Sequence, residues 1–139
     1  MDRPPAIPTT PHTSGDGAPP GEMTACAGAR AVITALLQPL KHASRQAEAD
    51  AHLAVSELIS NALRHGGGLT GFKADLDPAA TRLRLQVEDP SPEPPRRRLV
   101  PDPETPGGRG WAIVKRIATT CSVAVLPGAG KRITVTIAI

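Results

Sequence analysis

Glu57 and Asn61 are the residues of this 139-residue chain whose types and spacing first suggest chemistry. They lie four residues apart in the stretch VSELISNALRHGGG, so on a helix they stack on one face. A carboxylate can accept a proton, and an amide oxygen can bind a hard cation. The pair therefore suits a site where a cation meets a hydroxyl that must lose its proton. A solvated helix face has the same spacing, so both interpretations stay open at this point.

A helix from Ser44 to about His65 must carry this pair. Ser44 can cap its first turn, and the glycines at 66–68 end it. Its apolar residues recur at helical spacing on a different face, namely Val55, Leu58, Ile59 and Ala62. The polar pair can therefore border a cleft while the apolar face packs on a core.

A second, preceding helix is predicted over 25–38 because apolar residues recur there at three- and four-residue spacing. Residues 1–24 are rich in proline and glycine and show no such pattern, so they are predicted to form a disordered tail. The folded domain is accordingly expected to span 25–139.

Strands are predicted over 69–76 and 81–89, and the second one ends in an informative acid. Apolar residues alternate with polar residues along it, namely Leu83, Leu85 and Val87. The same alternation places Asp89 on the apolar side, where a carboxylate needs a partner. Asp89 is therefore either a turn residue before Pro90 or part of a site.

Residues 90–107 contain too much proline for a helix or a strand and are predicted to form a long loop. Gly107, Gly108, Arg109 and Gly110 follow, directly before a helical pattern that starts at Trp111. Glycines let the backbone approach a ligand, and the free amides of a helix start favour phosphate. A plain turn needs the same residues, so the glycines alone decide nothing.

The chain ends in a predicted hairpin whose last strand alternates strictly between apolar and polar residues from Arg132 to Ile139. The expected order is two helices, two strands, a helix and two strands. This order predicts an α+β fold, a two-layer α/β sandwich with helices on one face of a mixed, mostly antiparallel sheet.

Composition excludes several classes of function. The net charge is +3 and the only aromatic residues are Phe72 and Trp111, so direct nucleic-acid binding through stacking or a basic stripe is not expected. Cys26 and Cys121 show neither metal nor disulfide spacing. No apolar run has membrane-spanning length, and no hydrophobic leader is present, so a cytoplasmic protein without membrane contact is expected.

Taken in chain order, these features resemble the ATP-binding domain of the GHKL (Bergerat) superfamily, which includes gyrase and histidine kinases. The closest look-alikes are the bacterial anti-sigma-factor serine/threonine kinases. The resemblance covers about 29–139 and is carried by the segments SELISNALRHGGG, VEDPSPEPP and GGRGWAIVKRIA. It implies the Bergerat form of the sandwich, with ATP and Mg²⁺ as cofactors.

The resemblance also implies a role for each matching residue. Glu57 would be the general base, and Asn61 would bind Mg²⁺ and with it the nucleotide. Asp89 would accept a hydrogen bond from the exocyclic amine of adenine. Residues 90–107 would form the ATP lid. The phosphate-binding positions after the lid would be Gly108, Arg109 and Gly110.

Three positions depart from the pattern of these kinases. Pro90 stands where a glycine usually follows the aspartate, and Trp111 stands where a smaller aliphatic residue is usual. Arg132 occupies the place of a threonine that helps to hold the base. Thr134, two residues further on the same side of the strand, is expected to bind the nucleotide instead.

The partners implied by the resemblance are a sigma factor, which the kinase sequesters, and a STAS-type anti-anti-sigma protein, which it phosphorylates on serine or threonine. A homodimer stays open. The alternative is a non-catalytic ATP-binding or ATP-free interaction module, which the departures at Pro90 and Arg132 favour. The catalytic half of a sensor histidine kinase is a weaker option, because His42 and His52 lie in or near short helices.

Overall fold

The computed structural model describes residues 20–95 and 108–139. Its helices are α1 (Pro20–Leu37), α2 (Arg45–Arg64) and α3 (Gly108–Ile117). Its strands are β1 (Gly71–Leu76), β2 (Arg82–Asp89), β3 (Thr120–Leu126) and β4 (Gly130–Ala138). Of the predicted tail, residues 1–19 lie outside this description, and so do residues 96–107 of the predicted lid.

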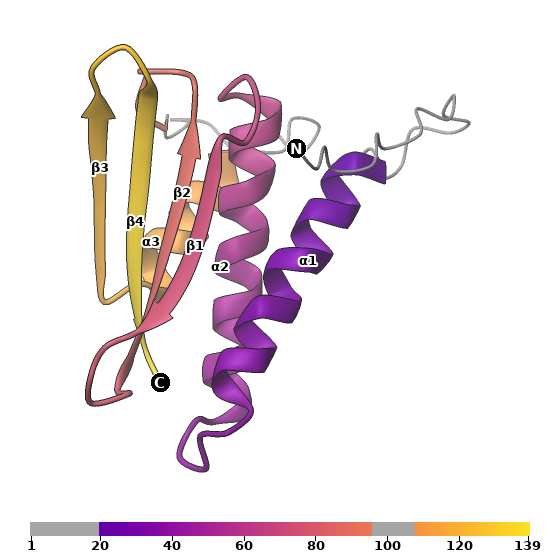
Figure 1. Ribbon diagram of the computed structural model, residues 1–139, viewed down its shortest axis with the longest axis vertical. Coiled ribbons are helices and arrows are strands. Elements are labelled where there is room, and N and C mark those ends of the chain that lie inside the picture. The colour runs from indigo at the N-terminus through magenta and orange to yellow at the C-terminus, as the bar shows by residue number, and fades with distance from the viewer. Residues whose placement is uncertain (1–19, 96–107) are drawn as a thin grey trace, which may run out of the picture.

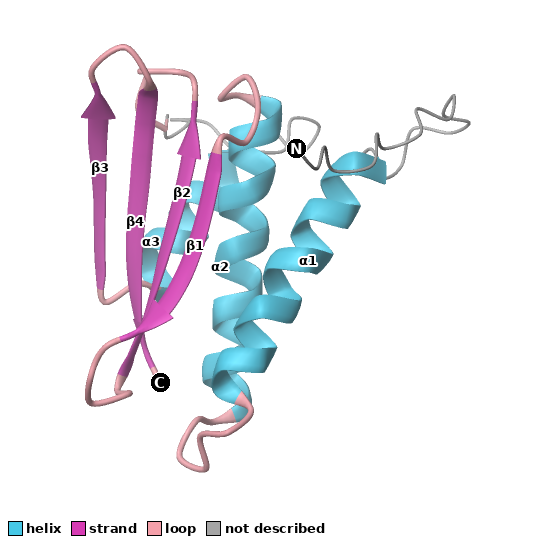
Figure 2. Ribbon diagram, in the orientation of Figure 1, coloured by secondary structure: helices cyan, strands magenta, loops and turns pink. Residues whose placement is uncertain are grey.

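The strands form one four-stranded sheet in the order β1-β2-β4-β3, and each neighbouring pair is antiparallel. The helices lie on one side of this sheet, with α2 between α1 and α3 (Figure 1). The two layers are separate in Figure 2, where cyan helices face magenta strands. The predicted α+β sandwich is confirmed, although the described strands contain no parallel pair and the sheet is therefore not mixed.

The core lies between α2 and the two central strands. Three cross-strand pairs of β2 and β4 point toward the helices, namely Leu83 with Ile137, Leu85 with Val135 and Val87 with Ile133. Each of these side chains is at most 2% exposed. Leu58 and Ile59 of α2 complete the layer. Apart from Cys26, the fully buried residues of this core are aliphatic, because the sequence has almost no aromatic residues to offer.

Both ends of α2 follow local sequence signals. The hydroxyl of Ser44 accepts a hydrogen bond from the Ala47 amide at 3.0 Å, as predicted for the N-cap. At the other end the chain turns through Gly67 and Gly68, whose φ angles of 82° and 137° suit glycine. These two signals fix where α2 begins and ends.

Helix α1 begins five residues before the predicted boundary, so residues 20–24 belong to the domain and not to the tail. Pro20 suits a helix start, where its missing amide hydrogen is not needed. Glu22 is 4% exposed and makes two hydrogen bonds to Arg64 of α2, at 2.8 and 2.9 Å. This contact joins residues 42 positions apart, so helical periodicity could not reveal it.

None of the described helices combines the length and the apolar character that a bilayer crossing requires.

Leu85→Ala is expected to lower the free energy of unfolding by about 2–5 kcal/mol, because it removes a fully buried side chain and leaves a cavity. Val125→Ala is the control, since Val125 is 60% exposed, and should change stability by less than about 0.5 kcal/mol. Urea denaturation measures both. Equal effects of the two substitutions would contradict the described core.

Candidate active site

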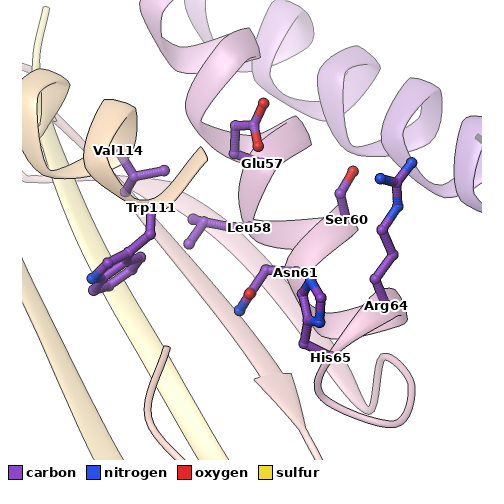
Figure 3. Close-up of a pocket in the computed structure, with 8 residues that line it drawn as sticks. All are labelled: Glu57, Leu58, Ser60, Asn61, Arg64, His65, Trp111 and Val114. Carbon is purple, nitrogen blue, oxygen red and sulfur yellow. The ribbon is translucent and has the colours of Figure 1, made fainter. Parts of the chain in front are cut away.

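A cavity of about 240 Å³ lies between α2 and α3. Its lining residues are Glu57, Leu58, Ser60, Asn61, Arg64 and His65 from α2, and Trp111 and Val114 from α3. Figure 3 shows Asn61 pointing toward the side of Trp111, whereas Arg64 extends the other way, toward α1. The predicted polar face of α2 is therefore not simply solvated, because it forms one wall of a cavity.

Glu57 is half-buried beside the start of α3. Burial raises the pKa of its carboxyl group, the nearby Arg64 guanidinium lowers it, and the charge of Glu22 raises it again. The net shift is upward, because desolvation is the largest of the three effects. A carboxylate with a raised pKa holds a proton more tightly, which suits it to act as a general base near neutral pH.

Gly110 packs directly on this carboxylate. A Cβ added at Gly110 would lie 1.9 Å from Glu57 Oε2 and 2.8 Å from Cδ, so a larger residue here would have to displace the Glu57 carboxylate. Gly110 and Gly108 lie in the first turn of α3, where backbone amides lack intrahelical partners. Arg109 lies between them, and its side chain is outside the described part of the structure. The predicted phosphate-binding turn thus meets the predicted base.

Asp89 is 1% exposed at the end of β2. Its Oδ1 accepts hydrogen bonds from the Ser91 amide and from Lys131 Nζ, each at 2.9 Å. Lys131 Nζ also lies 2.9 Å from Oδ2, but no hydrogen bond is directed at that oxygen. Oδ2 faces Gly66, where an added Cβ would lie 2.6 Å away. Oδ2 therefore has an ion-pair contact with Lys131 but no well-directed hydrogen bond, and its second lone pair could accept one from a ligand.

The predicted residues follow one another along α2. Gly110 contacts Glu57, Asn61 lies one helical turn further on, and Asp89 contacts Gly66, just past the helix end. At 1.5 Å per residue, Glu57 and Gly66 are separated by roughly 13 Å along the helix axis. Asp89 does not itself line the cavity, but it touches the residue next to His65, which does. This sequence of contacts suits an extended ligand with an anionic end and an amine-bearing end.

The prediction for Thr134 is wrong. Thr134 pairs with Gln86 across the sheet, and side chains alternate along a strand, so both lie on the face opposite Asp89. Arg132 lies on that opposite face too, where its Nε donates to Glu88 Oε2 at 3.1 Å. The residue directly across from Asp89 is Lys131, which is 3% exposed.

Lys131 was missed although the sequence contains its signal. Ile133, Val135 and Ile137 form the apolar side of β4, and continuing their alternation backwards places Lys131 on the same side. Arg64 lies one helical turn after Ser60 and also lines the cavity. Its anchoring by Glu22 had no local signal.

The described residues supply only some of the groups that a magnesium–nucleotide site needs. The described residues contain no cluster of three or more His, Cys, Asp and Glu side chains that could hold a metal. Asn61 therefore needs phosphate oxygens to complete a magnesium shell, as is usual for Mg²⁺ at phosphate sites. The Asp89 carboxylate suits an amine-bearing end of ATP, and the backbone amides in the first turn of α3 suit its phosphate end. The cavity itself is smaller than the roughly 300–1,000 Å³ of typical ligand pockets.

Glu57→Gln is expected to raise the melting temperature at pH 7, because burial penalises the charged form of this side chain. Since the folded-state pKa lies above that of the unfolded chain, protonation favours the native state. The difference in melting temperature between Glu57→Gln and wild type should therefore become smaller as the pH falls through the folded-state pKa of Glu57. Thermal melts from pH 7 to pH 4 measure this.

Glu48→Gln, on a more exposed part of the same helix, is the control and should not raise the melting temperature at pH 7, because the Glu48 side chain is 37% exposed and lies 3.7 Å from His52. Stability that is equal for wild type and Glu57→Gln at pH 7 would contradict the burial of Glu57.

Comparison with known proteins identifies the family of this chain. A search of curated proteins finds no match to the chain. The sequence pattern of the histidine kinase-like ATPase domain matches residues 20–137. This range contains every described helix and all but the last residue of β4, so the match extends over the whole described fold. The chain therefore belongs to the histidine kinase-like ATPase domain family.

Proposed function

We propose that the protein is an ATP-dependent serine/threonine kinase that phosphorylates an anti-anti-sigma partner and sequesters a sigma factor. Membership of the histidine kinase-like ATPase domain family supports ATP as the bound nucleotide. The kinase assignment rests on the contact between the Glu57 carboxylate and Gly110 at the start of α3. It brings a proton acceptor to a turn whose free amides suit a phosphate group.

Each side chain has a defined task in this proposal. Glu57 accepts the proton of the partner's hydroxyl as that oxygen attacks phosphorus. Asn61 holds Mg²⁺ through its amide oxygen, and the amides of Gly108 and Gly110 bind the phosphates. Asp89 Oδ2 accepts a hydrogen bond from the adenine amine. When bound, ATP would supply the γ-phosphoryl group and leave as ADP, and Mg²⁺ would offset the negative charge that develops during transfer.

The partner assignment rests on the resemblance of three segments to anti-sigma-factor kinases. Two of the described histidines, His52 on α2 and His42 in the loop before it, make hydrogen bonds within the fold. His52 Nε2 lies 2.9 Å from Thr34 Oγ1 between α2 and α1, and His42 Nε2 lies 2.8 Å from the Ala80 carbonyl oxygen. A hydroxyl on a separate protein is the acceptor that we propose.

A non-catalytic module that sequesters its partner is the second candidate. The small cavity supports it, as does Pro90, a stiff residue directly after Asp89 where the resembling kinases usually have glycine. Calorimetry with Mg-ATP separates the possibilities. Binding without transfer to any partner favours a module that keeps its nucleotide, and no binding favours one that acts without ATP.

Glu57→Gln is expected to reduce phosphoryl transfer to a STAS-type partner about 10²–10⁴-fold, the usual contribution of a general base. ATP affinity should stay within about threefold, because Glu57 is proposed to contact the hydroxyl and not the base or Mg²⁺. Transfer from γ-labelled ATP measures the first quantity, and calorimetry measures the second. Glu48→Gln serves as the matched control and should retain wild-type transfer. Undiminished transfer by Glu57→Gln would remove Glu57 from its role.

A further inference from the structure

Strand β3 forms one edge of the sheet and lacks the features that usually keep an edge from pairing with another chain. Among the described residues it pairs only with β4, and Figure 1 shows it at the edge farthest from α1. An edge strand presents free amide and carbonyl groups, which proteins usually protect with charged residues, proline, bulges or short strands. The sequence of β3, TCSVAVL, contains no charge and no proline, and its register with β4 has no bulge.

The opposite edge differs in each of these respects that involve side chains. Strand β1 carries the charged residues Lys73 and Asp75, and α1 packs beside it. Asp75 forms an ion pair with Arg84 of the neighbouring strand at 2.6 Å. Of the two edges, β3 is therefore the one suited to accept a further strand.

The side chains of β3 extend the apolar side of the sheet beyond the part that the helices cover. Cys121 and Val123 are partly buried against the core. Val125 follows on the same side by alternation, but it is 60% exposed. An added strand with its own apolar side chains on this side would cover Val125.

We propose that β3 is the interface of a homodimer, in which the β3 strands of two copies of this chain pair antiparallel and join their sheets. The two-fold axis passes Val123, which lies opposite the partner's Val123, while Cys121 lies opposite the partner's Val125. This alignment overlaps the whole strand and keeps both apolar sides on one face of the joined sheet. The inference goes beyond the proposed function and does not depend on ATP.

Charge favours a second copy as the occupant, and it favours the antiparallel direction. In a symmetric dimer a surface meets itself, so a charged residue near the axis would meet its own copy, and β3 has none. Burial raises the pKa of the Cys121 thiol and the charge of Lys115 lowers it, so Lys115 lies close to that end of the strand. Antiparallel pairing places Lys115 near the partner's uncharged turn at 127–129. Parallel pairing would instead bring two lysines together.

Sedimentation equilibrium of the full chain, without nucleotide, tests the proposal. The mass of the wild-type chain should rise from 14.4 kDa toward twice that value between about 1 μM and 1 mM protein. Val125→Lys should weaken dimerisation about tenfold or more, because its ammonium would lie near the partner's Lys115. Val125→Glu should weaken it less, since a carboxylate there meets a positive charge. Val32→Lys, at a 42% exposed site on α1, is the control and should leave dimerisation unchanged.

Cross-linking tests the alignment of the two strands. Val123→Cys in a Cys121→Ser background should form a disulfide-linked dimer under oxidising conditions, because directly opposite Cβ atoms lie about 4.5–5.5 Å apart. Val125→Cys in the same background should not, since the two substituted positions would lie four residues apart, roughly 13 Å along the strand. Electrophoresis without reducing agent measures both.

A wild-type chain that stays monomeric at about 1 mM would overturn the proposal, and that measurement does not require any variant to fold. A monomer whose β3 edge binds an extended peptide of another protein would count against it in the same way. Dimerisation that Val125→Lys does not weaken, or cross-linking at position 125 in place of 123, would overturn it as well. None of these outcomes depends on nucleotide binding or phosphoryl transfer, so failure here is distinguishable from failure of the proposed function.

Discussion

The two-sided character of α2 is the constraint on which the rest of the structure depends. One side buries Leu58 and Ile59 against the sheet, and the other carries Glu57 and Asn61 into the cavity. The helix cannot turn about its axis to expose more of its polar side without withdrawing apolar side chains from the core. Because burial of each such side chain contributes about 1.5–3 kcal/mol, packing holds the orientation of the site residues. The core and the candidate site are therefore two results of a single helix orientation.

Charges inside this small domain occur in matched pairs. Glu22 is buried against Arg64, and Asp89 is buried against Lys131. Each pair joins two elements that are distant in sequence, α1 to α2 and β2 to β4. Such pairs contribute little net stability when compared with apolar residues, but removing one partner is costly. They consequently favour one particular arrangement of the elements around the site, whatever their net contribution to folding.

The parts of the fold that could be predicted from the sequence are those with a local pattern. The Ser44 cap, the alternation that turned Asp89 inward, and the glycines before Trp111 all depend on neighbouring residues, and the structure has each in its expected place. Cross-strand register is different, because it depends on which residue of β4 meets Asp89. Alternation alone places Lys131 on the apolar side of β4 and Arg132 and Thr134 on the other side, but only the register shows that Lys131 is the residue opposite Asp89. The start of α1 was missed for a similar reason, since its anchor lies in another helix.

The contact of Gly110 with Glu57 has a consequence for proton affinity. The Glu57 carboxylate is poorly solvated partly because the backbone of α3 covers it. A displacement of α3 by a bound partner or ligand would admit water to the carboxylate and weaken its hold on a proton, whereas closer approach would strengthen it. The proton affinity of Glu57 thus depends on the position of α3. A movement of this helix when another molecule binds would therefore change how strongly the carboxylate holds a proton.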